Sequence, residues 1–258
     1  DRDIALKAME AIVFRAYDEL DKDVYDSDEV QIKLLKSAAE GLSRMNKGPD
    51  QQLLVHQAEM HSRLGQALFR MNRYEPALLE LDKAARCIDS MNAMQQAARD
   101  TRFLQLRTVA TKARVLYQMD NDTDLWPALM AAIPLADDLM REYPADRALL
   151  LEVAEVHQDY AYAIATSESE AAALKDYTEA LDLHVRAGPI ETLSFNERLV
   201  RLQMHLDVAG AFYDAEDAES AIRQYQRLEK QAEKCMQLDE QSEFPDLSHA
   251  SKTYLLQA

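Results

Sequence analysis

The chain has few of the residues that interrupt helices. Its 258 residues include 5 glycines and 7 prolines, too few for an all-β or α/β chain of this length. No apolar run reaches the roughly 18 residues that a membrane span requires. The longest candidate, Leu125 to Ala136, contains Pro127 and Pro134. It indicates a buried helix, and no membrane partner is expected.

Cysteine is also scarce. Cys87 and Cys235 fall on predicted helices, 148 positions apart. A disulfide scaffold or a zinc site is therefore not expected, and half-buried thiols in a reducing compartment fit better. Without a signal peptide at the start, we expect a cytoplasmic protein. The first residue is Asp rather than Met, so a fragment of a longer protein is one interpretation.

Motifs of catalysis are missing as well. The five glycines are not paired at the spacing of a phosphate-binding loop, and neither an HExxH zinc motif nor a Gly-x-Ser-x-Gly elbow occurs. Carboxylates are plentiful, but no acid/base pair can be nominated among them. The sequence thus predicts no enzyme and no cofactor. An enzyme on a helical solenoid would need a buried polar cluster that the sequence does not reveal.

Histidines leave two alternatives open. Glu155 and Asp159 share one helical face and His157 lies on another, a weak pattern for a metal site. His61 and His205 occupy equivalent positions in their helices. They are interpreted as packed side chains filling an aromatic position between helices, with pH sensing as the alternative.

Charge is distributed unevenly. The net charge is −17, which argues against nucleic acid or an anionic membrane as partner. Residues 1–50 carry 12 acids and 8 bases, residues 51–118 carry 6 and 10, and residues 119–258 carry 28 and 11. One basic segment thus lies between acidic ones.

The remaining composition is that of helices. Ala, Leu, Glu, Gln, Arg and Met dominate, and apolar residues recur at helical spacing. We expect a single all-α domain over residues 1–258, built of about five antiparallel helix pairs with a polar loop at 237–247. The expected pairs cover 2–46, 51–91, 93–143, 146–188 and 194–236, and a short capping helix covers 248–257.

The clearest hairpin lies in residues 51–91. Small and apolar residues follow one another there at the spacing of the tetratricopeptide repeat: Gly65, Leu68, Ala77, Leu81 and Ala84. The match departs from that family in two places, since His61 holds the aromatic position and the terminal proline is missing. The resemblance implies a right-handed α-solenoid, a TPR-like array, and a role in protein–protein interaction.

Self-similarity continues downstream. Trp126-Pro127-Ala128 echoes Glu75-Pro76-Ala77, and the second-helix alanines Ala77, Ala128, Ala173 and Ala221 lie 51, 45 and 48 residues apart. This exceeds the 34-residue tetratricopeptide period, so we expect longer helices.

A second, looser resemblance covers about the first 90 residues. Phe14-Arg15-Ala16-Tyr17-Asp18-Glu19-Leu20, then Gly41-Leu42-Ser43-Arg44-Met45, then the unit at 58–91, are similar to helical-repeat regions that follow catalytic domains in bacterial serine/threonine kinases and STAND-type signalling ATPases. It implies a scaffold, docking or sensor module of a larger bacterial signalling protein. The alternative is a regulatory domain that binds a peptide signal and controls an attached effector.

In stacked helical hairpins the first helices line a concave groove, which is the usual ligand surface. Its arginines and aromatic residues would suit an acidic or C-terminal peptide segment; alternatively, the arginines only balance neighbouring acidic repeats. Counting from the small-residue position predicts these groove residues: Glu59, Ser62, Gln66, Phe69, Arg70, Arg107, Ala110, Arg114, Tyr117, Gln118, Glu155, Gln158, Tyr162, Gln203 and Tyr213.

Overall fold

The computed structural model describes residues 28–45 and 50–240, and within these ranges every element is a helix. The all-α prediction is confirmed. The solenoid arrangement and the number of pairs stay predictions. Residues 2–27 of the expected pair 2–46 and the expected cap at 248–257 lie outside the described residues.

The contacts divide the chain into two compact units, Asp1–Leu135 and Ala136–Ala258. The first contains α2 (Asp28–Met45), α3 (Gln51–Arg70), α4 (Tyr74–Asp89), α5 (Ala93–Gln96), α6 (Arg99–Gln118) and most of α7 (Asp122–Glu142). The second contains the end of α7, α8 (Arg147–Ser167), α9 (Glu170–Arg186), the 3-10 helix η1 (Ile190–Thr192), α10 (Phe195–Asp214) and α11 (Ala218–Glu240). A repeat array can also be divided in this way, because each repeat contacts mainly its neighbours. The one-domain interpretation therefore stays a prediction.

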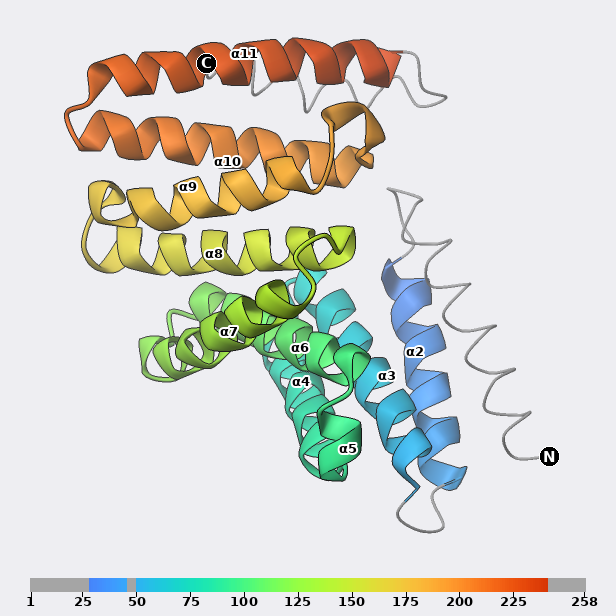
Figure 1. Ribbon diagram of the computed structural model, residues 1–258. Helices are drawn as coiled ribbons and strands as arrows, with labels where there is room; N and C mark the ends of the chain where they lie inside the picture. Colours follow the sequence, from blue (N-terminus) through green and yellow to red (C-terminus); the bar gives the residue numbers. More distant parts are fainter. Residues whose placement is uncertain (1–27, 46–49, 241–258) are drawn as a thin grey trace. The chain divides into compact units, whose positions relative to one another are not determined.

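Neighbouring helices pack in chain order within each unit (Figure 1). In the first unit, α3 contacts α2, α4 and α6, and α4 also contacts α6. In the second, α8 contacts α9, α9 contacts α10, and α10 contacts α11. In the first unit, α3 thus meets α6, the first helix of the next pair, as well as its own partner α4.

The α3/α4 hairpin forms where the sequence predicts it. Asp50 caps α3, because its side chain accepts hydrogen bonds from the amides of Gln52 and Leu53. Gly65 is required for the close approach of the two helices, since a Cβ there would lie 2.7 Å from Leu81 Cγ. The other signature residues, Leu68, Ala77, Leu81 and Ala84, are buried.

One turn recurs at a fixed interval of 48 residues. Asn72, Asp120 and Glu216, which follow α3, α6 and α10, all have left-handed backbone angles, with φ of 55°, 52° and 60°. The next residue in each turn donates its amide to a carbonyl five residues back: Arg73 to Leu68 at 2.9 Å, Asn121 to Leu116 at 3.0 Å, and Asp217 to Phe212 at 3.0 Å. This is the hydrogen-bond pattern of a Schellman helix end. Glu168, at the corresponding position after α8, has a φ of −126° and lacks it.

The 48-residue interval corrects the sequence-based spacing of the alanines. Counting from the turns, the equivalent of Ala77 in the second pair is Leu125, which is buried, and Ala128 lies one helical turn further on. The uneven intervals of 51 and 45 residues arose from matching Pro127 to Pro76. The small residues of the first helices, Gly65, Ala113, Ala161 and Ala209, follow the 48-residue register without exception.

Helix ends differ from the prediction at two places. α4 ends at Asp89 rather than at residue 91, the expected end of the pair 51–91. α11 continues to Glu240, into the expected loop 237–247. No glycine or proline precedes Pro245 in that stretch, so nothing in the sequence stops the helix earlier.

A buried arginine holds the end of α9 in the second unit. Arg201 on α10 is 3% exposed. Its Nε donates to His184 Nδ1 at 3.1 Å, and its terminal nitrogen donates to the carbonyl oxygens of His184 and Gly188, the latter at 2.8 Å. A cation bound to the last carbonyls of a helix also suits the negative end of the helix dipole.

Candidate functional site

The predicted groove residues fall on first helices only. In the first unit they lie on α3 and α6, and in the second on α8 and α10. Within each unit, neighbouring first helices contact one another through polar side chains from this set. The two units are described in turn.

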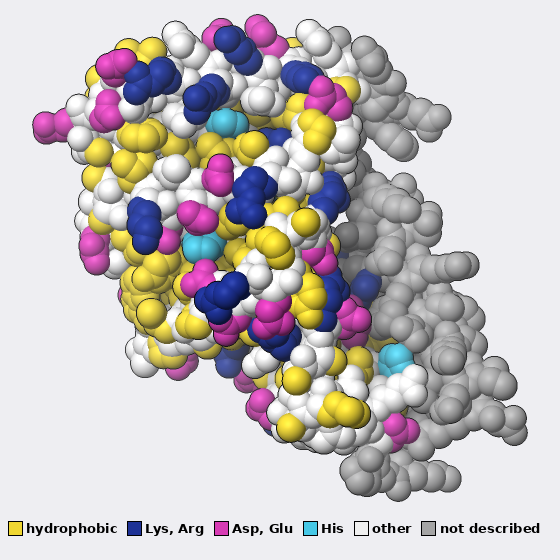
Figure 2. Space-filling model, viewed as in Figure 1, with side chains coloured by type: hydrophobic (Ala, Val, Ile, Leu, Met, Phe, Trp, Pro, Cys, Tyr) yellow, Lys and Arg dark blue, Asp and Glu magenta, His cyan; other side chains and the backbone are white. Residues whose placement is uncertain are grey.

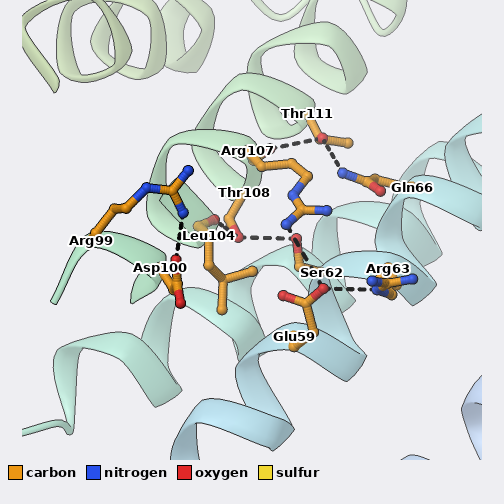
Figure 3. A network of polar contacts seen from close by, with 10 residues as sticks. All are labelled: Glu59, Ser62, Arg63, Gln66, Arg99, Asp100, Leu104, Arg107, Thr108 and Thr111. Carbon is orange, nitrogen blue, oxygen red and sulfur yellow. Dashed lines mark hydrogen bonds and ion pairs between the residues drawn. The ribbon is translucent and has the colours of Figure 1, made fainter. Parts of the chain in front are cut away.

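Figure 3 shows the polar network between α3 and α6. Glu59 on α3 accepts a hydrogen bond from Arg63 Nε at 2.7 Å, and its Oε1 lies 3.7 Å from a terminal nitrogen of Arg107 on α6. Below this ion pair, the buried hydroxyls of Ser62 and Thr108 share a hydrogen bond at 3.1 Å. The network therefore joins the two helices through both charged and neutral groups.

The network extends one turn further along both helices. Gln66 Nε2 donates to Thr111 Oγ1 at 3.4 Å, and the Thr111 hydroxyl donates to the Arg107 carbonyl at 2.8 Å. Ala110, by contrast, is buried and offers no side-chain hydrogen bond.

Arg107 is more accessible than Arg63, the other cation that contacts Glu59. Its guanidinium stacks on Phe103, with 5.3 Å between Cζ and the ring centroid, and Arg99 approaches the same ring at 5.9 Å. Among the described residues, no acceptor lies within hydrogen-bonding distance of the Arg107 guanidinium, whose nearest carboxylate oxygen is that of Glu59 at 3.7 Å. The side chain is 23% exposed. Stacking and ion pairing thus orient a guanidinium that keeps unused donors.

The network drawn in Figure 3 does not include the remaining predicted residues of the first unit. Phe69 is half-buried and packs against Tyr74, with ring centroids 6.2 Å apart. Arg70 and Gln118 are exposed, and Arg114 and Tyr117 are half-buried. The predicted cluster of three arginines is thus represented in the network by Arg107 alone.

In the second unit, three predicted residues converge on a carboxylate that sequence reasoning missed. Asp207 on α10 accepts hydrogen bonds from Gln158 Nε2 at 2.7 Å, from the Tyr162 hydroxyl at 2.7 Å and from Gln203 Nε2 at 2.6 Å. Burial raises the pKa of Asp207, and these three hydrogen bonds oppose the rise. Burial, together with the charge of Asp207, also raises the pKa of Tyr162.

The two units repeat one contact. Tyr162 and Asp207 lie 45 residues apart, as do Gln66 and Thr111, and both pairs occupy equivalent positions in the 48-residue register. The 48-residue register is the feature of the sequence from which a role for Asp207 could have been predicted.

Acidic groups gather near this contact. Burial raises the pKa of Glu170, a hydrogen bond with Tyr177 lowers it, and the charges of Asp207 and Asp214 raise it further. Of the other predicted residues, Glu155 is half-buried and Tyr213 is 70% exposed.

Histidines bridge the helices of three pairs. His61 Nδ1 lies 2.6 Å from Glu80 Oε2, His157 Nδ1 lies 3.6 Å from Asp176 Oδ1, and His205 Nδ1 lies 3.4 Å from Gln224 Oε1. The partner follows each histidine by 19 residues, and the histidines keep the 48-residue register. These side chains therefore pack between helices, with one nitrogen directed at the second helix.

The two best-defined bridges differ in electrostatics. Burial would raise the pKa of Glu80, but hydrogen bonds from His61 and Lys83 bring it below its usual value. Burial lowers the pKa of His205 to about 4, and the charge of Arg201 acts in the same direction. His205 is thus neutral at pH 7.

The described residues contain neither a metal-binding cluster nor a membrane-spanning helix. No group of three or more His, Cys, Asp or Glu side chains is placed to hold a metal ion within residues 28–45 and 50–240. In the described part of the chain, no helix combines the length and apolar character of a membrane span. Neither cysteine forms a disulfide; Cys87 is half-buried and Cys235 is buried.

The face shown in Figure 2 carries basic and acidic side chains interspersed at short distances, with apolar side chains between them. No model of a known protein family matches the chain, and no curated protein matches its sequence.

Proposed function

We propose that the protein is a non-catalytic interaction module that binds a peptide or protein segment along its first helices. In this proposal, the helix pairs form a TPR-like array, and the segment binds along α3 and α6 of the first unit. The wider role, a scaffold or sensor within a larger bacterial signalling protein, rests on the resemblance of the first 90 residues alone.

The proposal rests on the surroundings of the Arg107 guanidinium. A guanidinium held in place by Phe103 and Glu59, but without a hydrogen bond to the described residues, is ready to receive an acceptor. Because stacking on Phe103 already restricts the arginine side chain, binding an acceptor costs less conformational entropy.

The charge of the site supports a partner with a single carboxylate. Glu59, Arg63 and Arg107 together carry one net positive charge, and Arg99 is engaged by Asp100 at 2.6 Å. One carboxylate would neutralise this site, whereas a phosphate group, with about −1.5 to −2 charges, would exceed it. The partner is therefore an acidic or C-terminal peptide segment.

The second unit supplies the matched comparison. Gln203 occupies the position of Arg107 in the 48-residue register, and it is hydrogen-bonded to Asp207. Since the carboxylate there is the protein's own, the α8–α10 face is not expected to bind an acidic segment. Its role in the proposal is to hold neighbouring first helices in register.

Selection of displayed random peptides on the immobilised protein tests the proposal. Selected peptides should be rich in Asp, Glu or a free C-terminus, and their affinity should fall with rising salt. Replacing Arg70, Arg107 and Arg114 together by Ala should weaken binding by roughly tenfold or more, given about 1.5–3 kcal/mol for a hydrogen bond to a charged group.

Gln203→Ala is the matched control and should leave the affinity for the selected peptide unchanged. If no peptide is enriched, or if the triple variant binds with unaltered affinity and salt dependence, the proposed function is wrong.

A further inference from the structure

A small cavity lies in the first unit between α4, α6 and α7, and shares Thr108 with the network of α3 and α6. Its volume is about 170 Å³. The walls are mostly apolar; of the polar lining residues, Thr108 is buried, Lys112 is half-buried, and Asp89 and Gln105 are exposed. The lining residues are Leu81, Ala85, Ile88, Asp89, Gln105, Thr108, Val109, Lys112, Ala131 and Leu135.

The 48-residue register explains the apolar walls. In the preceding pair, the equivalent cleft is lined by His61, Glu80 and Lys83, which interact with one another. Val109, Ala128 and Ala131 stand at the corresponding positions of the α6/α7 pair. The α6/α7 pair therefore has apolar side chains at all three positions. The pairs that contain His157 and His205 keep the contact between the histidine and the second helix.

The edge of the cavity favours a positive charge. Asp89 is the last residue of α4, it is exposed, and its carboxylate has no ion-pair partner among the described residues. The C-terminal end of a helix also carries a partial negative charge. The nearby Lys112 does not offset these charges, because its ammonium is paired with Asp82 at 2.7 Å.

We infer that this cavity binds a small organic amine, with a single ring or short aliphatic body between α4, α6 and α7 and its ammonium group beside Asp89. The cavity volume of about 170 Å³ agrees with a ligand of this size, because an apolar cavity of about 150 Å³ holds one benzene molecule. A drug-sized ligand is excluded by the same measure, since such sites have volumes of about 300 Å³ or more. The inference does not rest on the peptide site proposed above.

Three isosteric probes test the inference: benzylamine, benzyl alcohol and benzoate. Methyl NMR spectra of the full chain, recorded during titration with each probe, follow Ile88, Val109 and Leu135. Benzylamine should shift these methyl signals in a saturable manner. Benzyl alcohol should bind about two- to fivefold more weakly, as expected for the loss of a partly exposed ion pair of up to about 1 kcal/mol. Benzoate should be the weakest of the three.

Two variants locate the ring and the ammonium. Asp89→Asn should reduce the affinity for benzylamine to that for benzyl alcohol, and should leave benzyl alcohol unaffected. Ala131→Leu should abolish binding of both, because the larger side chain occupies the edge of the cavity. Ala131 is exposed on α7, so this variant should fold normally, which circular dichroism verifies.

Glu75→Gln removes an exposed acid at the other end of α4 and serves as the charge control. It should leave all three affinities unchanged. The inference is overturned if benzoate binds as tightly as benzylamine, if Asp89→Asn and Glu75→Gln behave alike, or if folded Ala131→Leu retains benzylamine binding.

Discussion

The Tyr162 hydroxyl on α8 donates a hydrogen bond of 2.7 Å to Asp207 Oδ2 on α10. The tyrosine also packs edge-on against Tyr177 of α9, with ring centroids 5.5 Å apart. One side chain thus connects three successive helices of the second unit. Asp207 depends on it, because a buried carboxylate is stable only when its oxygens accept hydrogen bonds.

Tyr162→Phe keeps the ring and removes this donor. We expect a loss of about 1–3 kcal/mol in the free energy of unfolding, the cost of leaving a buried acceptor short of a partner. Urea denaturation followed by circular dichroism measures it. Tyr213→Phe, on the same face but 70% exposed, should change stability by less than about 0.5 kcal/mol. Equal effects of the two substitutions would contradict the assigned role of Tyr162.

His205 should make the protein less stable in mild acid. Its folded-state pKa, about 4, lies below the ordinary value of 6.5. Between these values the unfolded chain binds a proton that the folded chain does not, so this contribution is complete above pH 6.5 and is lost as the pH falls towards 4. The loss is on the order of 3 kcal/mol at most.

His205→Phe isolates the effect, since an aromatic ring can fill the same space. The variant should lose less stability than the parent between pH 6.5 and pH 4, as measured by urea midpoints at several pH values. His184, whose pKa burial also lowers to about 4, remains in both proteins and cancels in the difference. Parallel stability curves for parent and variant would show that His205 is not buried as a neutral side chain.

Two glycines in first helices should respond in opposite directions to replacement by alanine. At Gly65 a Cβ would lie 2.7 Å from Leu81 Cγ, whereas at Gly210 it would meet no atom within 4 Å. Gly65→Ala should therefore destabilise the protein by about 1–3 kcal/mol through overpacking. Gly210→Ala should stabilise it by up to about 1 kcal/mol through helix propensity. Thermal unfolding of both variants checks the pair, and stabilisation by Gly65→Ala would refute the close approach of α3 and α4.

Arg201→Met should destabilise the second unit strongly. The substitution leaves the carbonyls of His184 and Gly188 without their buried donor. We expect a loss of about 2–4 kcal/mol, as for other buried polar groups that lose a partner. Hydrogen exchange should show the opening first at the end of α9 and in η1. If instead exchange increases uniformly or stability is unchanged, Arg201 does not hold this turn.

Local patterns in the sequence were sufficient to predict the hairpins. Gly65, Ala77 and Leu81 predict the α3/α4 pair because tight helix contact requires small residues at that spacing, and the structure places them at the contact. The register of the second pair was misread at Pro127, because proline is tolerated at more than one position near the start of a helix.

Contacts between helix pairs could not be predicted in the same way. Asp207 resembles any solvated acid in a chain of net charge −17, and only the structure reveals that it is half-buried and accepts hydrogen bonds from α8. The pairing of Arg107 with Glu59 likewise depends on two helices 48 residues apart in sequence. The predicted residues lie on α3, α6, α8 and α10, but the sequence did not indicate which of them engage one another.

The most direct test of the proposed function is to locate a bound peptide. An acidic peptide selected on the protein, carrying a nitroxide label next to its acidic residue, would broaden nearby amide signals in the NMR spectrum. The account predicts that broadening centres on Ser62, Gln66 and Arg107 of α3 and α6 and disappears in Arg107→Ala. Broadening centred on the second helices α4 or α11, and retained in Arg107→Ala, would contradict it.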